Sequence, residues 1–268
     1  MVSAGHPLAA QAGLRMLERG GNAIDAMVAT QLVLTLVEPQ SSGLGGGAFL
    51  LYFDAHAKRI VAYDARETAP AGATATLFVE RGEAMPFREA VVGGRSVGVP
   101  GTPRLLEAAH ARYGKLPWAT LFEPAIELAQ KGFPVSERLH RLAGVYKELA
   151  EQPAARAHFF SADGKPRPTG TMLRNPALAA TLRALAANGA DAFYAGDIAR
   201  DIVAAVRGHA NSGSMSLEDL AGYRVRVVEP LCGAYRDKLV SENSAFKILS
   251  REVVVDSFAV KRLLATPL

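Results

Sequence analysis

Residues 39–49 of the chain read PQSSGLGGGAF, and this stretch decides how the rest of the sequence is interpreted. Pro39 ends an apolar segment, four glycines lie within residues 43–47, and the apolar run Ala48–Phe53 follows at once. Because glycine lets backbone segments approach closely, the cluster indicates a tightly packed turn that leads into a strand. Exposed backbone N–H groups in such a turn can also form a site for an anion or a carboxylate.

The glycine cluster formally matches a dinucleotide-binding fingerprint. Gly43, Gly45 and Ala48 have its spacing, and Asp64 lies at about the distance where that motif carries an acidic residue. The fingerprint needs a strand before the glycines and a helix after them, whereas the sequence predicts the opposite order. This context argues against nucleotide binding.

Two helices are predicted before the cluster. Pro7–Arg19 has an amphipathic pattern and is ended by two glycines. The positions expected to share its apolar face are Leu8, Ala12, Leu14 and Leu17. Asn22 is placed as the N-cap of a second helix, about Ala23–Val37, with Asp25 at its third position as a helix-start charge. This helix is apolar nearly all round, which predicts burial, and it is too short and too polar to cross a membrane.

The strands expected after the cluster lie early and late in the chain. Ala48–Phe53 and Arg59–Asp64 are predicted to pair across a turn, in a sheet covered on both faces. Tyr223–Val228 alternates in the manner of a strand with one wet face. The intervening sequence predicts mainly helices, so a single α+β domain is favoured over two consecutive ones.

Helix boundaries in the middle of the chain are marked by capping residues and glycines. The expected helices start at Thr102, Pro117, Ser136, Asn175, Asp197 and Ser216. Two segments, Ala71–Ala90 and Ala150–Gly170, are candidate linkers.

Composition narrows the function classes. The chain has 268 residues, 49% of them hydrophobic, and a net charge of +4 that is spread along the sequence. A basic stripe interleaved with aromatic residues is absent from the sequence, which argues against nucleic-acid binding. The single cysteine, Cys232, cannot form an internal disulfide and is expected to be a buried structural thiol. The six histidines have no metal-ligand spacing.

Arg66 is the candidate binding residue. A guanidinium group offers a rigid fork of donors that fits a carboxylate through two parallel hydrogen bonds. On spacing alone, however, an arginine next to a glutamate such as Glu67 is more often part of an ordinary surface ion pair. His6 and Asp25 are interpreted as structural, and neither Ser41 nor Ser42 has an identifiable histidine or acid partner for nucleophilic chemistry.

The glycine cluster, together with further motifs in order along the chain, resembles the heavy subunit of γ-glutamyltranspeptidases (glutathione hydrolases). These motifs are residues 6–9 (HPLA), 20–26 (GGNAIDA), 66–70 (RETAP), 98–101 (GVPG), 116–118 (LPW), 190–194 (ADAFY), 217–220 (LEDL) and 229–231 (EPL). The resemblance covers roughly residues 1–238, and we expect a heavy-subunit-like domain over 1–239 followed by a dissimilar tail over 240–268.

This resemblance implies an α+β fold of the Ntn-hydrolase type, an αββα sandwich of which this chain forms the heavy-subunit half, with one flank left open. It also implies transfer or hydrolysis of the γ-glutamyl group of glutathione and related amides, without a cofactor. Arg66 is the residue that the resemblance assigns to the substrate's α-carboxylate. The implied partner is a light subunit from the same precursor, and the implied location is periplasmic or secreted, although the sequence shows no signal peptide.

The sequence departs from the family after Lys238. The family's nucleophilic threonine lies in a Thr-Thr-His-x-Ser segment, which this sequence does not contain, and Thr266 is followed only by two residues. No catalytic residue is therefore assigned, and the chain alone is expected to be inactive. Truncation, a frameshift, a fusion and a pseudoenzyme are the alternatives, and a β-lactam (glutaryl-type) acylase is the rival activity.

Overall fold

The computed structural model describes residues 1–230, 234–242 and 245–254. The chain divides into two compact units. The first comprises Met1–Phe49 and Tyr63–Arg226, and the second comprises Leu50–Ala62 and Val227–Leu268. Cys232 and Thr266 lie outside the described residues.

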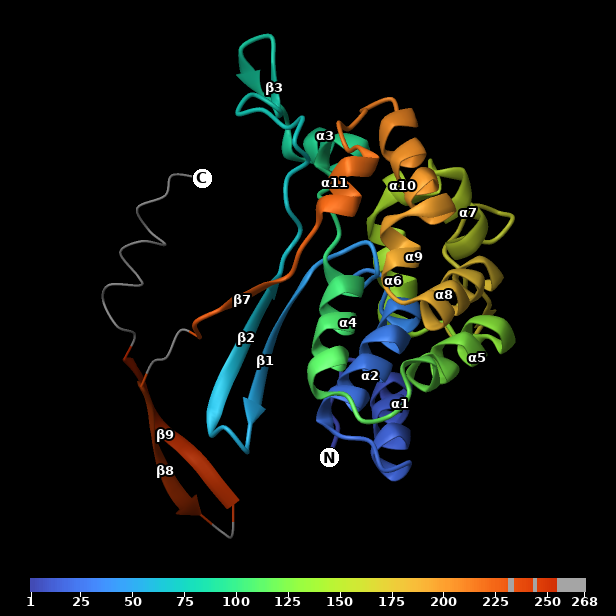
Figure 1. Cartoon of the computed structure of the whole chain (residues 1–268). Helices are drawn as coiled ribbons and strands as arrows, with labels where there is room; N and C mark the ends of the chain where they lie inside the picture. The colour runs from blue at the N-terminus through green and yellow to red at the C-terminus, as the bar shows by residue number, and fades with distance from the viewer. Residues whose placement is uncertain (231–233, 243–244, 255–268) are drawn as a thin grey trace. The chain divides into compact units, whose positions relative to one another are not determined.

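The first unit is built around a pair of helices, α1 (Pro7–Glu18) and α2 (Ala23–Val37), which lie side by side (Figure 1). Helix α2 is buried as expected, and it also contacts α4 and α5. The buried residues of α1 are Ala9, Ala12, Gly13 and Met16, whereas Leu14 is 44% exposed. The predicted apolar face of α1 is therefore wrong in detail. A Cβ added at Gly13 would lie 2.3 Å from the Thr30 hydroxyl oxygen on α2, so close helix approach selects the smallest residues for the contact.

The start of α2 is tied to a distant loop. Asn22 caps the helix, and Asp25 completes a capping box by accepting the backbone N–H of Asn22 at 2.8 Å. The Asp25 side chain is fully buried, and its carboxylate also accepts the backbone N–H groups of Lys115 and Leu116 at 3.1–3.3 Å. Asp25 thus has the structural role that the sequence predicted, and it joins two segments of the first unit.

The remaining helices of the first unit start at most of the predicted caps. Their bounds are α3 (Phe87–Val91), η1 (Gly94–Ser96), α4 (Thr102–Tyr113), η2 (Trp118–Phe122), α5 (Glu123–Lys131), α6 (Glu137–Val145), η3 (Lys147–Ala150), α7 (Pro153–Phe159), α8 (Pro176–Asn188), α9 (Asp191–Tyr194), α10 (Gly196–Gly208) and α11 (Leu217–Gly222). The side chains of Ser136, Asn175 and Ser216 each accept an N-terminal backbone N–H, as expected for N-caps. The helix expected from Pro117 is divided into η2 and α5.

The two candidate linkers contain short elements that the sequence did not reveal. Strands β3 (Val79–Glu80) and β4 (Glu83–Ala84) pair antiparallel within the first linker, and α7 lies in the second. Another antiparallel pair joins β5 (Phe133–Pro134) to β6 (Met172–Leu173). Strands of two residues are too short to produce a periodic pattern.

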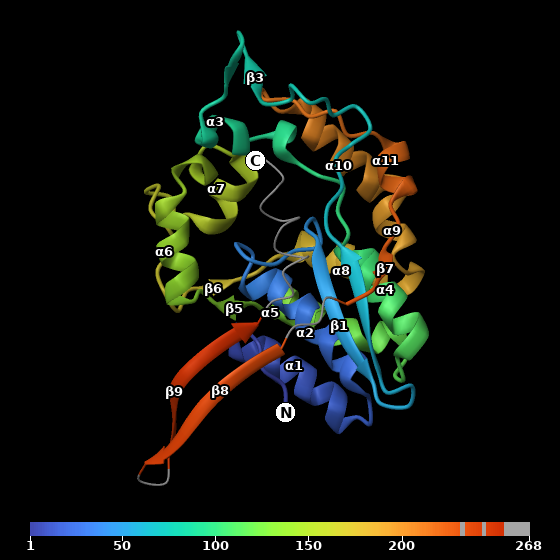
Figure 2. The same ribbon diagram turned by 90° about the vertical axis from the view of Figure 1, so that its left-hand side faces the viewer.

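The longest early strands are β1 (Ala48–Asp54) and β2 (Arg59–Ala65), which lie side by side (Figure 2). With β7 (Arg226–Val228) they form a sheet in the order β1-β2-β7. Alternate residues of β1, namely Phe49, Leu51 and Phe53, are 61–69% exposed, so the described residues leave one face of this strand uncovered. The prediction that both faces are covered is therefore wrong for the chain by itself.

The second unit contains a further strand pair, β8 (Ala234–Glu242) and β9 (Ala245–Val254). They pair antiparallel from Ala234 opposite Val254 to Glu242 opposite Ala245. Strand β9 lies within the segment that the sequence predicts to be a dissimilar tail.

Candidate functional site

The glycine turn before β1 is fastened to the start of α4. The carbonyl oxygen of Gly46 accepts the backbone N–H groups of Gly101 at 2.9 Å and Thr102 at 3.1 Å, and the Thr102 hydroxyl at 3.1 Å. Helix α2 precedes the turn and strand β1 follows it, which is the reverse of the order in a dinucleotide-binding motif. These hydrogen bonds fix the position of the turn relative to the start of α4 within the first unit.

Gly47 brings this turn against the end of β2. A Cβ added at Gly47 would lie 2.6 Å from the Ala65 carbonyl oxygen and 2.7 Å from the Glu67 backbone nitrogen. No side chain fits at either of these distances. The close approach places the backbone of Arg66 and Glu67 beside the glycine turn.

Arg66 forms the ion pair that its neighbour suggested. One terminal nitrogen, Nη1, lies 3.0 Å from Glu67 Oε2, and the Arg66 side chain is 66% exposed. Glu67 Oε2 is buried and has no hydrogen bond among the described residues. The Arg66 guanidinium is the positive charge that lies beside it. The exposed part of the guanidinium is open to a second carboxylate. Whether it binds one remains a prediction.

The backbone of Arg66 is held on both sides by side chains. Its N–H donates to Asp64 Oδ1 at 3.0 Å, and its carbonyl accepts the Tyr223 hydroxyl at 2.9 Å. The other carboxylate oxygen of Asp64 pairs with the Arg226 guanidinium. Burial raises the pKa of Tyr223, and the nearby charges of Asp64 and Glu67 raise it further, so the phenol stays protonated and donates.

A second tyrosine supports the first. Tyr194 packs parallel to Tyr223, with ring centroids 6.0 Å apart and an interplanar angle of 10°. The Tyr194 hydroxyl donates to the Pro100 carbonyl at 2.8 Å, and the Arg104 guanidinium lies over its ring at 4.5 Å. Burial also raises the pKa of Tyr194. The loop at residues 98–101 is thereby held between the tyrosines and the end of β2.

The other residues singled out from the sequence have structural contacts. His6 Nδ1 accepts the backbone N–H of Leu8 at 3.2 Å at the start of α1, and burial lowers the pKa of His6. Ser41 accepts a hydrogen bond from Arg138 at 3.2 Å, and Ser42 accepts one from Gln31 at 2.6 Å. Neither serine is placed beside a histidine by these contacts. Within the described part of the chain, no group of three acidic, histidine or cysteine side chains could hold a metal ion.

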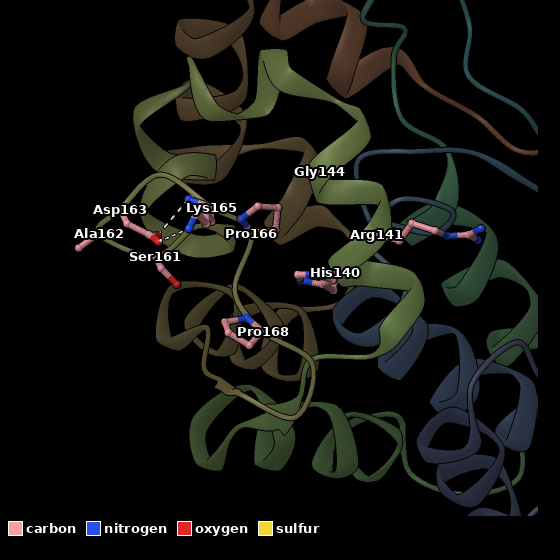
Figure 3. A pocket seen from close by; sticks show the side chains of 9 residues that line it. All are labelled: His140, Arg141, Gly144, Ser161, Ala162, Asp163, Lys165, Pro166 and Pro168. Atoms are coloured by element: carbon pink, nitrogen blue, oxygen red, sulfur yellow. Dashed lines mark hydrogen bonds and ion pairs between the residues drawn. The ribbon is translucent and has the colours of Figure 1, made fainter.

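A separate cavity of about 680 Å³ lies between α6 and the loop at residues 161–168 (Figure 3). Asp163 and Lys165 pair with each other at 3.5 Å at the tip of this loop. His140 extends from α6 toward the loop, and its Nδ1 lies 2.9 Å from the Arg167 carbonyl oxygen. This cavity shares no lining residue with the Arg66 segment.

The sequence predicts Arg66 and the glycines but not the residues that hold them. It marks Asp64 only as a distant acidic residue and Tyr223 only as a strand residue. A signal is present in the motif at residues 98–101, because a Cβ at Gly101 would lie 2.2 Å from the Tyr223 hydroxyl oxygen. That relation is visible only once residues far apart in sequence are placed together.

Comparisons with known proteins identify relatives of this chain. A family model described as gamma-glutamyltranspeptidase matches residues 9–249. The chain is 41% identical over 237 residues to the glutathione hydrolase proenzyme of Bacillus subtilis (strain 168), covering 88% of this chain and 40% of that protein. It is 38% identical over 243 residues to the acylase ACY 1 proenzyme of a Pseudomonas species (strain SE83), covering 88% of this chain and 43% of that protein.

Among solved structures, the Helicobacter pylori gamma-glutamyltranspeptidase matches with a TM-score of 0.80 and 30% identity, covering 97% of this chain and 70% of that one. The fold is therefore α+β, of the Ntn-hydrolase type, as expected. The chain belongs to the γ-glutamyltranspeptidase family, and it spans about two fifths of the length of the curated relatives it matches. The described residues include no helix that is both long enough and apolar enough for a transmembrane span.

Proposed function

We propose that this chain is the heavy-subunit portion of an enzyme that transfers or hydrolyses the γ-glutamyl group of glutathione and related amides. The observation that carries the proposal is the position of Arg66. In a chain matched by the family model over residues 9–249, Arg66 lies beside the glycine turn with a largely exposed guanidinium group. The family match supplies the chemistry, and the geometry supports the binding role.

Arg66 binds the α-carboxylate of the γ-glutamyl group in this proposal. Glu67 Oε2 lies 3.0 Å from Nη1 of the guanidinium. In this proposal the edge formed by Nε and Nη2 makes two parallel hydrogen bonds to the substrate carboxylate. Lysine cannot make this paired contact, because an ammonium group is a point charge without a planar fork.

The nucleophile belongs to a partner portion of the protein. A threonine hydroxyl attacks the γ-amide carbonyl, its own α-amino group accepts the proton, and the amine of the substrate leaves. An oxyanion hole stabilises the tetrahedral intermediate, and water or an acceptor amine then releases the γ-glutamyl group. This sequence contains no Thr-Thr-His, so the 268-residue chain alone is proposed to be inactive.

The uncovered face of β1 supports a light-subunit partner. Phe49, Leu51 and Phe53 are exposed at 69%, 69% and 61%, and apolar strand residues of this size are normally covered. A relative named as a proenzyme is consistent with a partner cut from the same precursor. By the same family argument, the site of action is proposed to be periplasmic or extracellular.

Release of p-nitroaniline from L-γ-glutamyl-p-nitroanilide tests the proposal. The purified chain should release none above an Arg66→Ala control, and co-expression with the C-terminal portion that its relatives possess should give activity. Activity in the isolated chain that depends on Arg66 would contradict the two-portion assignment. A well-folded two-portion protein that leaves the anilide intact would contradict the proposed reaction.

A glutaryl-type acylase is the second candidate, because a relative at 38% identity is named as an acylase. A glutaryl group retains the terminal carboxylate but lacks the α-amino group, so Arg66 would serve either substrate. Parallel assays with γ-glutamyl and glutaryl anilides separate the two activities, since only the first requires recognition of the amine.

A further inference from the structure

We infer that Tyr223 and Arg226 are positioning residues that set the location of Arg66, and this inference rests on the function proposed above. Arg66 is at the end of β2, one residue beyond the strand. At a strand end the ladder no longer holds the backbone, so its polar groups need other partners. In this chain those partners are side chains.

Tyr223 holds the carbonyl side of Arg66. Its hydroxyl donates to the Arg66 carbonyl oxygen at 2.9 Å across 157 positions of sequence, and the tyrosine is only 4% exposed. The ring lies against Tyr194, so its orientation is fixed by packing. Gly101 leaves the space that the hydroxyl occupies, because a Cβ there would lie 2.2 Å away. The contact is therefore built from four separate segments, those of Arg66, Gly101, Tyr194 and Tyr223.

Arg226 acts on the amide side of Arg66 through Asp64. The Arg226 guanidinium pairs with Asp64 Oδ2, while Asp64 Oδ1 accepts the Arg66 N–H at 3.0 Å. The Asp64 side chain is 15% exposed, so the carboxylate is partly shielded from water. Tyr223 and Arg226 are three residues apart, and they act on the two sides of the Arg66 backbone, Tyr223 directly and Arg226 through Asp64. The short segment from the end of α11 to the first residue of β7 thus fixes the backbone position from which the Arg66 side chain extends.

Such control matters because the Arg66 side chain has few restraints of its own. It is 66% exposed, and it pairs with the adjacent Glu67. A paired contact to a carboxylate requires donors placed to within a fraction of an ångström. Fixing the backbone is the means by which this chain limits the positions that the exposed guanidinium can reach.

The chain provides a matched control. Tyr223→Phe and Tyr194→Phe each remove one buried hydroxyl that donates to a backbone carbonyl, at 2.9 Å and 2.8 Å. Only the first of these carbonyls belongs to Arg66. Both variants should lose similar global stability, so a difference at Arg66 reports positioning and not general weakening.

The test uses the 268-residue chain labelled with 15N. The Arg66 side-chain Nε–H resonance is assigned by its loss in Arg66→Lys. Tyr223→Phe should shift this resonance and speed exchange of the Arg66 backbone amide by about tenfold relative to Tyr194→Phe. Arg226→Gln, a change at a side chain that is 71% exposed, should act in the same direction without unfolding the chain.

Equal effects of the two tyrosine variants at Arg66, or none in Tyr223→Phe and Arg226→Gln, would overturn the inference. This readout needs no activity, so it is independent of the proposed reaction. If the positioning result holds while Arg66→Lys leaves substrate binding unchanged in the two-portion enzyme, the proposed function fails and the positioning contact stands.

Discussion

Removing the Asp25 carboxylate should strongly destabilise the first unit of the chain. The side chain is fully buried, and its two oxygens accept backbone N–H groups from Asn22, Lys115 and Leu116. Asp25→Ala leaves these three donors without a partner in a water-poor site. Each buried unsatisfied donor costs about 1–3 kcal/mol, and partial access of water reduces the sum to roughly 4 kcal/mol.

Asp25→Asn is the more informative change, since it preserves shape. It keeps one acceptor oxygen but turns an NH₂ group toward backbone donors, which should lower the free energy of unfolding by about 2 kcal/mol. That is a large part of the roughly 5–15 kcal/mol typical of a folded domain. Urea unfolding followed by circular dichroism measures the loss.

Asp197→Asn is the control for this prediction. Its side chain is 89% exposed and pairs with Arg200 of the same helix, so the free energy of unfolding should change by less than about 0.5 kcal/mol. A loss below about 0.5 kcal/mol for Asp25→Asn, at an unchanged denaturant slope, would refute the view that this carboxylate joins α2 to the loop after α4.

Two further predictions concern the glycine turn and pH. Gly47→Ala should lower the free energy of unfolding by about 1–3 kcal/mol, because the added Cβ would meet Ala65 and Glu67. Gly45→Ala is the control and should be nearly neutral, because an added Cβ there has nothing within 4 Å. Equal thermal unfolding midpoints for the two variants would disprove the close contact at Gly47. Burial, with a smaller contribution from the Arg167 charge, lowers the pKa of His158 below 6.5, so the unfolded chain binds the proton more tightly. His158 therefore stabilises the fold above about pH 6.5, and this contribution falls as the pH drops through the folded-state pKa. NMR titration should give a His158 pKa below 6.5, and a value at or above 6.5 would contradict the burial argument. The His158→Gln variant should lose less stability than the unchanged chain between about pH 7 and 5.

Local signals in the sequence predicted the helix starts well. Asn22, Ser136, Asn175 and Ser216 each cap a helix, because a cap depends only on residues two or three positions away. The glycine turn and its two neighbouring strands were also predicted, because glycine clusters and apolar runs are local signals in the sequence.

Features set by tertiary contacts were not predictable in this way. The buried face of α1 is chosen by close approach to α2, which favours Ala9 and Gly13 over the larger Leu14. The sequence of β1 resembles that of a buried strand although one face is uncovered, because hydrophobicity does not reveal which partner covers it.

The candidate site likewise combines features that local sequence predicts with features that only tertiary contacts determine. Arg66 and its ion pair with Glu67 follow from adjacency and from the family resemblance. The contact from Tyr223 to the Arg66 carbonyl spans 157 positions and leaves no periodic signal, so only the structure reveals it.

The Michaelis constant of the two-portion enzyme for L-γ-glutamyl-p-nitroanilide tests the central claim most directly. Arg66→Lys should raise KM by at least about tenfold, because one of two charge-assisted hydrogen bonds to the α-carboxylate is lost. Arg88→Lys is the matched control, since Arg88 is 73% exposed and also pairs with a glutamate. A rise of about tenfold for Arg66→Lys with no change for Arg88→Lys is the predicted result, and an unchanged KM in Arg66→Lys would contradict it.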